Sequence, residues 1–490
     1  MSTKHAVVIG AGIGGLAVAS LLAARGYTVD VNEQNEHPGG KMQQFTCGGY
    51  RFDTGPSLLT MPFILEKLFT DCGEVLTDYL TLTELSPLCR YFYRDGTRFD
   101  NYSNRGKTVA EIERFSKHDA KVYASFLDYS ENLYSKTADA FLFNPLYDMS
   151  DLKQLNLLDF LSIDAFSTVS DKVDSYFESP YLRQFFKRFT TYNGSSPYQA
   201  PATLNVIPHV ELNQGGFYVK GGLYGITEAL HKLAKKQGVN FHFESKVKRI
   251  DVSGKDVSGV TLSDGEKISC DLLFANSDAT DTILNLLPGD VVSKQKRKKQ
   301  SKLEPSCSGF VMLLGCSTTW PQLKHHNIFF SDDYRKEFRD IFSRQRLPAD
   351  PTIYVANTSY SDPAHAPESS SNLFVLVNAP YVAGQDWDLL KQIYGETIIQ
   401  TLEAQGLDGL KESIEIQEVI TPINFLNRYG SNKGSIYGTA SNDKFSAFVR
   451  PRNKLRDLNN LYLVGGSTHP GGGIPLVVQS AFNAMELLKR

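Results

Sequence analysis

The sequence has few cysteines for its length, and they do not form a pattern that binds metal. Only six occur in 490 residues, scattered along the chain without a C-x-x-C pair. A zinc site and a framework of disulfides are therefore not expected. We predict no metal site.

The sequence also lacks a long hydrophobic run and an excess of charge. No segment approaches the roughly 18 consecutive apolar residues that a membrane-spanning helix needs. The net charge is −3, so the charge balance gives no reason to expect binding to nucleic acid. The first predicted strand starts within a few residues of Met1, which leaves no room for a targeting peptide. We expect a cytoplasmic protein that associates peripherally with a membrane surface.

Glycines near the N-terminus form the first informative motif. Gly10, Gly12 and Gly15 follow the apolar residues 6–9 in the pattern G-x-G-x-x-G and open a predicted helix. Such glycines permit a tight turn, close approach of the backbone to a pyrophosphate, and close packing of the helix. Glu33 ends the next predicted strand, where an acid accepts a hydrogen bond from a ribose hydroxyl. The nucleotide is therefore NAD or FAD, without a 2′-phosphate.

The segment that follows Glu33 favours FAD over NAD. In HPGGKMQQFTCGGYRFDTGPS, residues 37–57, three glycine turns follow one another closely, and Lys41 lies beside the first. An NAD domain would usually continue into another helix and strand. A segment so rich in turns suits an extended dinucleotide, along which backbone amides and a lysine can lie. An irregular surface loop is the alternative.

A third glycine-rich stretch lies near the C-terminus. A short apolar strand, residues 461–464, leads to Gly465 and Gly466, and residues 471–473 precede a largely apolar helix with Pro475 at its start. The amides at the N-terminus of such a helix stabilise negative charge, as on the pyrimidine edge of a reduced flavin.

Together these stretches resemble the FAD-dependent carotenoid desaturases of the bacterial phytoene desaturase family, a branch of the flavoprotein amine oxidases. GGSTHPGGGIPLVVQS, residues 465–480, is the most specific match, and YNGSSPYQAPATL, GGFYVKGGLYGITEAL and GSIYG followed by FVRPRN support it. The resemblance implies an enzyme with non-covalent FAD. It also implies an α/β fold, in which a Rossmann-type FAD-binding domain is interleaved with an α+β substrate domain that contains a helical layer.

The resemblance assigns FAD contacts to the glycine turns and to the ends of strands. The first turn meets the pyrophosphate, Glu33 the adenosine ribose and Val247 the adenine. Residues 55–57 approach the flavin, and Asn276, at the end of a predicted strand, lies near the nucleotide. The full set is Gly10, Gly12, Ile13, Gly14, Gly15, Glu33, Gly40, Lys41, Gly55, Pro56, Ser57, Val247, Asn276, Gly466, Gly472, Gly473, Ile474 and Leu476.

The predicted FAD-binding domain is discontinuous. It comprises residues 1–85, 222–290 and 415–490, and residues 86–221 and 291–414 form the substrate domain. The stretch from residue 225 to 277 reads as helix, strand, hairpin and strand, which would extend the same sheet.

Two stretches of the substrate domain have open interpretations. Residues 120–200 are dense in aromatics at helical spacing. Core packing accounts for most of them, and the alternative is that some line an apolar tunnel or dip into a membrane. The basic run at residues 293–302 is either a solvated loop or a contact with anionic lipid.

The expected activity is the desaturation of a carotenoid, with hydride transfer from an sp³ C–H bond to flavin N5. The best match is 3,4-desaturation of a 1′-hydroxycarotenoid, and phytoene or diapophytoene desaturation is the alternative. An amine oxidase acting on a small polar substrate and a non-enzymatic prenyl-binding protein are more distant alternatives. The electron acceptor would be oxygen or a quinone.

A neighbouring carbon must lose a proton in this reaction, and the sequence offers one pair of candidates. His209 and Glu211 are placed two residues apart on a segment predicted as a strand. Residues at this spacing share one face of a strand, so both would face the cavity as catalytic groups. The alternative is a histidine in the core that is paired with a structural acid.

Overall fold

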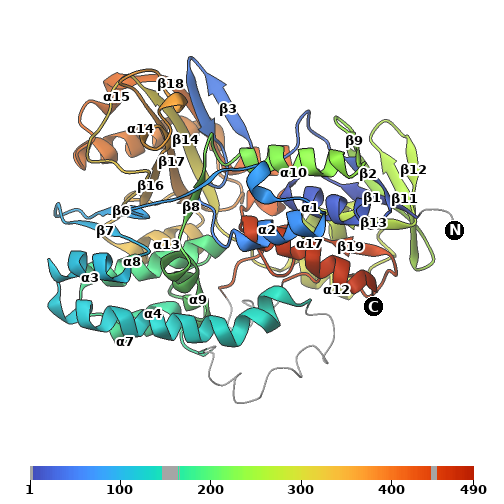
Figure 1. The fold of residues 1–490 in the computed structure, drawn as a ribbon, viewed down its shortest axis with the longest axis horizontal. Helices are drawn as coiled ribbons and strands as arrows, with labels where there is room; N and C mark the ends of the chain where they lie inside the picture. Colours follow the sequence, from blue (N-terminus) through green and yellow to red (C-terminus); the bar gives the residue numbers. More distant parts are fainter. Residues whose placement is uncertain (1–3, 146–163, 165, 443–449, 490) are drawn as a thin grey trace.

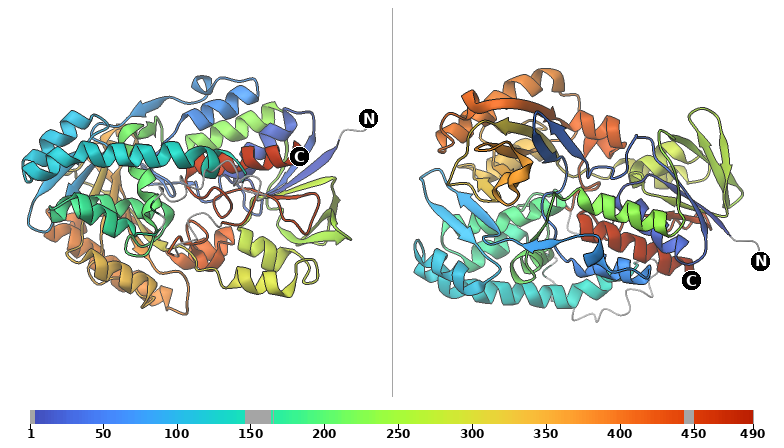
Figure 2. Two further views of the ribbon diagram at one scale, coloured as in Figure 1. Left: turned by 90° about the horizontal axis from the view of Figure 1, so that it is seen from below. Right: turned by 45° about the horizontal axis from the view of Figure 1, so that its top comes forward.

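A computed structural model describes residues 4–145, 164, 166–442 and 450–489. Two large β-sheets occupy opposite ends of the molecule, and helices cover both of them (Figure 1, Figure 2). The chain passes between the two parts several times. The predicted α/β fold, with a Rossmann-type sheet and an interleaved part containing a helical layer, is confirmed.

The first sheet has five parallel strands in the order β19-β13-β1-β2-β9. Apolar side chains alternate between its two buried faces. On one face Ala6 and Val8 pack with the helices, and on the other Val7 and Ile9 pack with a small three-stranded sheet. The strands are β1 (His5–Ile9), β2 (Thr28–Asn32), β9 (Asn240–His242), β13 (Leu272–Ala275) and β19 (Leu461–Leu463).

Three helices cover one face of this sheet, and α1 packs between the other two. The predicted succession of helix, strand, hairpin and strand between residues 225 and 277 is present, and its hairpin forms the three-stranded sheet on the opposite face. The helices are α1 (Ile13–Ala23), α10 (Gly225–Lys236) and α17 (Ile474–Lys489), and the small sheet contains β10 (Val247–Ser253), β11 (Asp256–Leu262) and β12 (Lys267–Ser269).

The second sheet has seven strands in the order β18-β14-β17-β16-β15-β6-β7. Its pairs are antiparallel except for β15 with β6. One face packs on α14 (Trp387–Ala404). The strands are β6 (Cys89–Phe92), β7 (Arg98–Asn101), β14 (Ser308–Cys316), β15 (His326–Phe329), β16 (Ile353–Asn357), β17 (Ser371–Ala379) and β18 (Ile414–Ile420).

A layer of helices completes the part of the molecule around the second sheet. Its aromatic residues pack mainly against one another, and the rings of Phe177 and Phe186 stack at 4.7 Å. Phe166 is instead 61% exposed, and Tyr147 and Phe160 lie outside the described residues. The layer contains α3 (Arg105–Glu113), α4 (Lys117–Ala138), η2 (Asp139–Phe143), α7 (Val169–Tyr176), α8 (Pro180–Lys187), η3 (Arg188–Asn193) and α13 (Tyr334–Phe342).

Shorter elements connect these layers. Two small antiparallel pairs are present: β3 and β4 form a hairpin, and β5 pairs with the sequence-distant β8. The strands are β3 (Gln44–Cys47), β4 (Tyr50–Asp53), β5 (Leu82–Glu84) and β8 (Phe217–Val219). The helical segments are α2 (Phe63–Asp71), η1 (Leu76–Asp78), η4 (Ala202–Asn205), α9 (Val206–Pro208), η5 (His209–Asn213), α11 (Ala279–Asp281), η6 (Thr282–Leu286), α12 (Lys294–Ser301), η7 (Thr358–Tyr360), η8 (Pro363–His365), α15 (Leu410–Ser413), α16 (Pro422–Tyr429) and η9 (Asn432–Gly434).

One prediction about local structure needs correction. The segment around His209 and Glu211 is helical, in α9 and η5, so the predicted strand was wrong. The domain edge predicted at residue 415 falls inside β18, which pairs with β14 of the second sheet. The domain bounds themselves stay a prediction.

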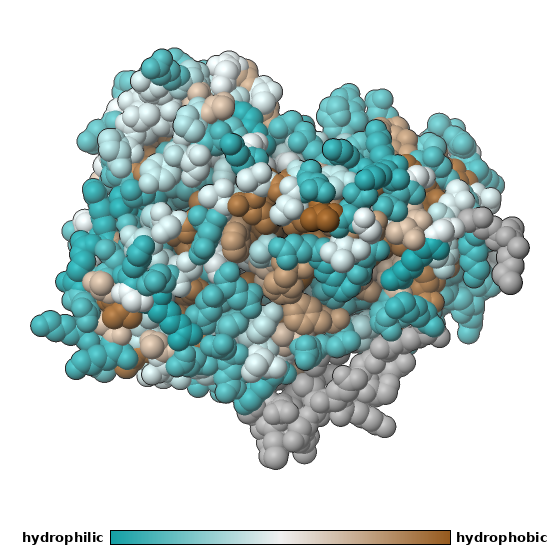
Figure 3. All heavy atoms as spheres, in the orientation of Figure 1, coloured by the Kyte–Doolittle hydropathy of each residue, from teal (hydrophilic) through white to brown (hydrophobic). Residues whose placement is uncertain are grey.

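Contact with a membrane depends on a protein's helices and on the apolar side chains at its surface. Within the parts of the chain that the structure covers, no helix is long and apolar enough for this. The face seen in Figure 3 is mostly hydrophilic, but apolar residues gather near its middle, over α2 and the end of α4. The basic run forms α12, whose residues are not buried.

The turn between β1 and α1 generates a prediction about stability. A Cβ atom added at Gly15 would lie 2.0 Å from the carbonyl oxygen of Gly10, so helix and strand would have to separate. We expect Gly15→Ala to destabilise the protein by about 1–3 kcal/mol or more. Thermal unfolding with saturating FAD measures this as a lower Tm.

A second helical glycine supplies the matched control. A Cβ atom at Gly395, inside α14, would meet only the flexible end of Met312 at 3.4 Å. Gly395→Ala should leave Tm unchanged or raise it, because alanine favours helix by about 0.5–1 kcal/mol. Equal Tm values for the two variants would contradict the tight packing assigned to Gly15.

Candidate functional site

A single cavity of about 650 Å³ connects the two parts of the molecule. One end is lined by residues that follow the strands of the first sheet, including Asn276. The other end is lined by residues of the second sheet, such as Val311 and Phe374. Ligands of open parallel sheets bind at the carboxyl ends of the strands, and the first end of the cavity lies there.

Most of the predicted FAD contacts line this cavity. The two exceptions are Gly14 and Gly15, which lie behind the turn. A Cβ atom at Gly14 would lie 2.7 Å from Oδ1 of Asn276 and 3.0 Å from the amide of Gly465. These two glycines therefore let the helix, β13 and the C-terminal segment approach one another.

The N-terminal end of α1 is arranged to receive an anion. Gly12 is its extended N-cap, no side chain caps the helix, and no acidic residue occupies its first turn. The amides of the first turn are thus available to a ligand. Gly10 has φ of 91°, and a Cβ atom at Gly12 would lie 2.6 Å from Nδ2 of Asn276.

Glu33 lies at the end of β2 with its carboxylate fixed by neighbouring donors. The Ala11 amide donates to Oε2 at 2.7 Å, and both nitrogens of Asn35 donate to Oε1. Oε1 thus accepts two hydrogen bonds, whereas Oε2 accepts one and keeps a free lone pair, and Glu33 lines the cavity. Nδ2 of the adjacent Asn32 has no hydrogen-bond partner among the described residues, which leaves a donor for a bound nucleotide.

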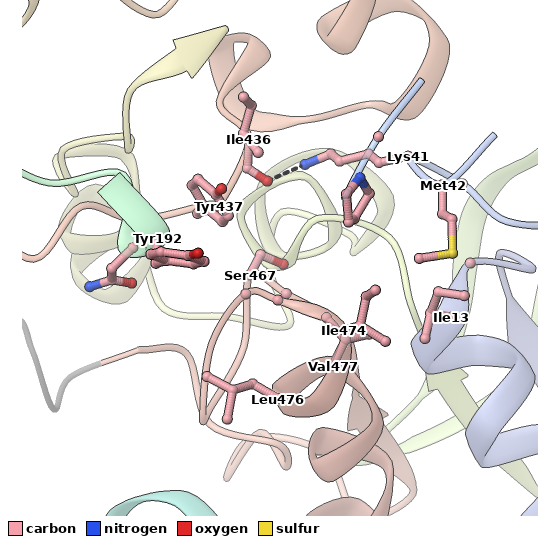
Figure 4. A pocket seen from close by; sticks show the side chains of 18 of the residues that line it. Ile13, Lys41, Met42, Tyr192, Ile436, Tyr437, Ser467, Ile474, Leu476 and Val477 are labelled. Carbon is pink, nitrogen blue, oxygen red and sulfur yellow. Dashed lines mark hydrogen bonds between the residues drawn. The ribbon is translucent and has the colours of Figure 1, made fainter. Parts of the chain in front are cut away.

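Lys41 lines the cavity and follows the turn at Gly39, which pairs with Gly12 at the start of α1. Its Nζ donates to the carbonyl oxygens of Ile436 at 2.7 Å and Ser435 at 3.2 Å (Figure 4). Burial lowers the pKa of Lys41 to about 8, and Asp278 partly opposes this shift. The lysine thus joins the second glycine turn to the segment before the C-terminal motif.

The C-terminal turn leads into α17 at the middle of the cavity. Gly473 has φ of 97°, and a Cβ atom there would meet nothing within 4 Å, so its free side faces open space. In contrast, a Cβ atom at Gly472 would lie 2.7 Å from the ring of Tyr437. Ile474, Leu476 and Val477 of the first helical turn also line the cavity (Figure 4).

These features fit FAD. The uncapped N-terminus of α1 suits the pyrophosphate, and the fixed carboxylate of Glu33 suits a ribose. The open space at Gly473, next to the N-terminus of α17, leaves room for a flat ring beside amides that favour negative charge. Val247 and the turn at residues 55–57 also line the cavity.

Arg450 is a cavity residue that the site prediction missed. Its Nη1 donates to the carbonyl oxygens of Tyr437 at 2.7 Å and Gly466 at 3.2 Å, and its Nη2 donates to Oδ1 of Asn193. No carboxylate of the described residues forms an ion pair with it, and burial lowers its pKa to about 10. The FVRPRN motif, which contains Arg450, supports the family resemblance but does not indicate a role for the arginine.

The two catalytic candidates are separated by the structure. Glu211 lines the cavity, and Nη2 of Arg188 donates to its Oε1 at 2.6 Å, while Tyr192 donates to Oε2. His209 lies outside the cavity lining, and its ring nitrogens contact the side-chain amides of Asn213 and Gln214. Burial lowers the pKa of His209.

Arg188 also lines the cavity and binds several of its side chains. Besides Glu211 it donates to the hydroxyl of Tyr91 at 2.6 Å, and its guanidinium lies 4.1 Å from the ring of Phe189. The aromatic layer thus surrounds a buried ion pair. Sequence reasoning missed Arg188 because its partners are distant in the chain.

A further polar group lines the wall formed by the second sheet. Oγ of Ser57 lies 2.5 Å from the hydroxyl of Tyr354, which lies 2.7 Å from Nδ1 of His326. All three residues line the cavity. Only Ser57 was predicted.

Comparison with known families gives one match that covers nearly the whole chain. The profile of the flavin containing amine oxidoreductase family matches residues 13–487. The chain is 37% identical to a 1-hydroxycarotenoid 3,4-desaturase from Flavobacterium sp. (strain P99-3), over 99% of both chains. It is 36% identical to a 4,4′-diaponeurosporene oxygenase from Staphylococcus aureus (strain bovine RF122 / ET3-1), over 98% of this chain and 96% of that protein.

Among solved structures, the fold is similar to that of an oxidoreductase from Methanosarcina mazei. The TM-score is 0.66, the identity is 17%, and the match covers 98% of this chain and 100% of the other. At this identity the similarity concerns the fold alone.

Glu33 generates a prediction about cofactor affinity. Glu33 lines the cavity and its Oε2 keeps a free lone pair, so Glu33→Ala removes a charged acceptor for the ribose. Such a hydrogen bond contributes about 1.5–3 kcal/mol, and we expect FAD to bind roughly 10- to 150-fold more weakly. Titration of the apoprotein with FAD, followed by flavin fluorescence, measures the Kd.

Asp30→Asn is the control, because Asp30 belongs to the same strand but binds His5 and His242 away from the cavity. That variant should keep the wild-type Kd. Wild-type affinity in Glu33→Ala would mean that the carboxylate only fixes Ala11 and Asn35.

Proposed function

The chain belongs to the flavin containing amine oxidoreductase family, as an FAD-dependent oxidoreductase, and we propose that it introduces a double bond into a carotenoid. The observation that carries this proposal is the continuity of the cavity. A dinucleotide at one end and a long apolar substrate at the other would meet beside the C-terminal turn.

The proposed substrate is a 1-hydroxycarotenoid, desaturated between carbons 3 and 4. Support comes from the relative of that name, which matches over its full length. Phytoene or diapophytoene desaturation is the alternative. Apolar residues on both sides of the cavity, such as Leu88, Ile207 and Leu376, suit any polyene chain. Selection between these substrates therefore has to depend on their end groups.

The residues around the cavity would orient the polyene and receive a proton. When bound, FAD supplies the hydride acceptor. Of the two candidates, Glu211 is the group that we propose as proton acceptor, because its carboxylate lines the cavity and His209 does not.

In Glu211→Gln, flavin reduction by substrate should slow much more than substrate binding weakens, and an unchanged reduction rate would exclude Glu211 from this role.

We also propose a site at which the polyene enters from a lipid surface. Phe63 at the start of α2 is 43% exposed, and its ring lies 6.3 Å from that of Phe143 in η2. Phe141 and Leu142 of the same turn line the cavity. An apolar patch therefore leads from the surface to the substrate end, and α12 adds basic residues that can contact anionic headgroups.

The proposed reaction gives a direct prediction. The FAD-loaded protein, supplied with a 1-hydroxycarotenoid in vesicles, should yield a product with one additional conjugated double bond, seen as a red-shifted polyene spectrum. Phytoene should give no coloured product. Coloured products from phytoene would instead assign the alternative reaction. Parallel assays in air and without oxygen, with an added quinone, identify the electron acceptor.

Membrane association gives a second prediction. Wild-type protein should sediment with anionic lipid vesicles, and Phe63→Ser should lower its partition several-fold, because a fully buried phenylalanine contributes about 1.5–3 kcal/mol. Ile393→Ser removes a residue that is 57% exposed on α14 and does not line the cavity, and it should have no effect. Equal partition of both variants would contradict the assigned patch. A decrease of binding with salt would measure the contribution of α12.

A further inference from the structure

The wall of the cavity formed by the second sheet carries a short chain of hydrogen-bonding groups. Ser57 follows the turn at residues 55–56, Tyr354 lies on β16 and His326 lies on the neighbouring β15. Oγ of Ser57, the hydroxyl of Tyr354 and Nδ1 of His326 are joined by distances of 2.5 and 2.7 Å. All three side chains line the cavity.

The histidine end of this row of hydrogen bonds is unpaired among the described residues. Nε2 of His326 has no hydrogen-bond partner in the described part of the protein. His326 is 3% exposed, and burial together with His325 and Arg188 holds its pKa well below the usual value, so the imidazole is neutral. A neutral imidazole with one nitrogen bonded offers the other nitrogen as a single donor or acceptor.

The proton order in the chain can run in either direction. If the Tyr354 hydroxyl donates to Nδ1, then Nε2 carries the proton and donates. If Nδ1 donates to Tyr354, then Nε2 accepts, and the Tyr354 proton goes to Ser57. A ligand hydroxyl, which both donates and accepts, satisfies the chain in both orders. A hydrocarbon would satisfy neither.

The surroundings make such an unpaired group unfavourable without a polar ligand. Leu58, Leu88 and Ile328 line the same cavity. A buried polar atom that loses water without gaining a partner destabilises the bound state. Nε of Arg188, another cavity residue, is also unpartnered among the residues described. The substrate end of the cavity is therefore more polar than a hydrocarbon substrate requires.

We propose that His326 and Tyr354 form a subsite for the hydroxyl group at the end of the polyene and thereby select a hydroxylated substrate over the hydrocarbon. This inference rests on the proposed function. The position of Ser57 supports it, because the family resemblance assigns the turn at residues 55–57 to the flavin. In a 1-hydroxy substrate the hydroxyl carbon is separated from carbon 3 by a single carbon. The hydroxyl of the substrate and the bond that is desaturated must then both lie beside the flavin ring.

The test compares two polyenes matched in length and unsaturation, one with a hydroxyl at carbon 1 and one with hydrogen there. For each, kcat/KM is measured with the FAD-loaded wild type, Tyr354→Phe and His326→Phe. Wild type should prefer the hydroxylated polyene, and each substitution should reduce that preference by about 10- to 100-fold. Tyr354→Phe removes one oxygen atom and keeps the ring, so it remains informative if His326→Phe does not fold.

Ile328→Val is the matched control. Ile328 lies on the same strand and lines the same cavity, but it makes no side-chain hydrogen bond. This variant should change turnover of both polyenes alike and keep the wild-type preference. A preference that falls equally in Ile328→Val would assign the selectivity to cavity shape and overturn the subsite.

Binding separates this inference from the proposed reaction. The probes are two polyenes in which the bond between carbons 3 and 4 is already double, with and without the 1-hydroxyl, so no turnover is needed. Tighter binding of the hydroxylated probe that is lost in Tyr354→Phe supports the subsite even if no desaturation occurs. Equal binding of both probes by wild type overturns the subsite. Desaturation of either substrate polyene in the kinetic test would still support the proposed function.

Discussion

The close approach of three backbone segments at the carboxyl ends of β1, β13 and β19 is the constraint on which the structure depends. Asn276 follows β13, and its backbone N–H donates to the carbonyl oxygen of Ile9 in β1 at 2.8 Å. Its side chain lies against the positions where Gly12, Gly14 and Gly465 would carry a Cβ atom. Residues more than 450 positions apart in the sequence thus meet without side chains between them, and the dinucleotide end of the cavity is the space that this junction leaves open.

The parts of the site that could be predicted are those with a local cause. A turn with positive φ needs glycine, and a helix N-terminus next to such a turn binds anions, so short patterns located Gly10, Lys41 and Gly473. Arg188 and His326 gave no such signal, and the FVRPRN motif around Arg450 did not indicate what the arginine binds. Their roles depend on partners brought together by folding, such as Glu211 for Arg188 and Asn193 for Arg450, and a single sequence does not show which polar residues will be buried together.

The error at His209 and Glu211 has a physical reason of the same kind. The segment NVIPHVEL contains β-branched residues that favour strands, and residues two apart share a face only in a strand. In a helical turn they point in nearly opposite directions. Accordingly Glu211 reaches the cavity and Arg188, while His209 turns to Asn213 and Gln214. Packing of η5 within the aromatic layer overrode the local preference.

Two buried arginines connect the ends of the cavity. Arg188 begins η3 and Asn193 ends it, and Arg450 donates to Asn193 and to the carbonyl oxygen of Gly466 before the C-terminal turn. A rotation of η3 that moved the Arg188–Glu211 pair would therefore also disturb the segment before α17. Because hydrogen bonds of a buried cation are strong and unfavourable to leave unmade, η3 acts as a rigid link. The link thus keeps the two ends of the cavity in a fixed position relative to each other, although one end is built on the first sheet and the other on the second.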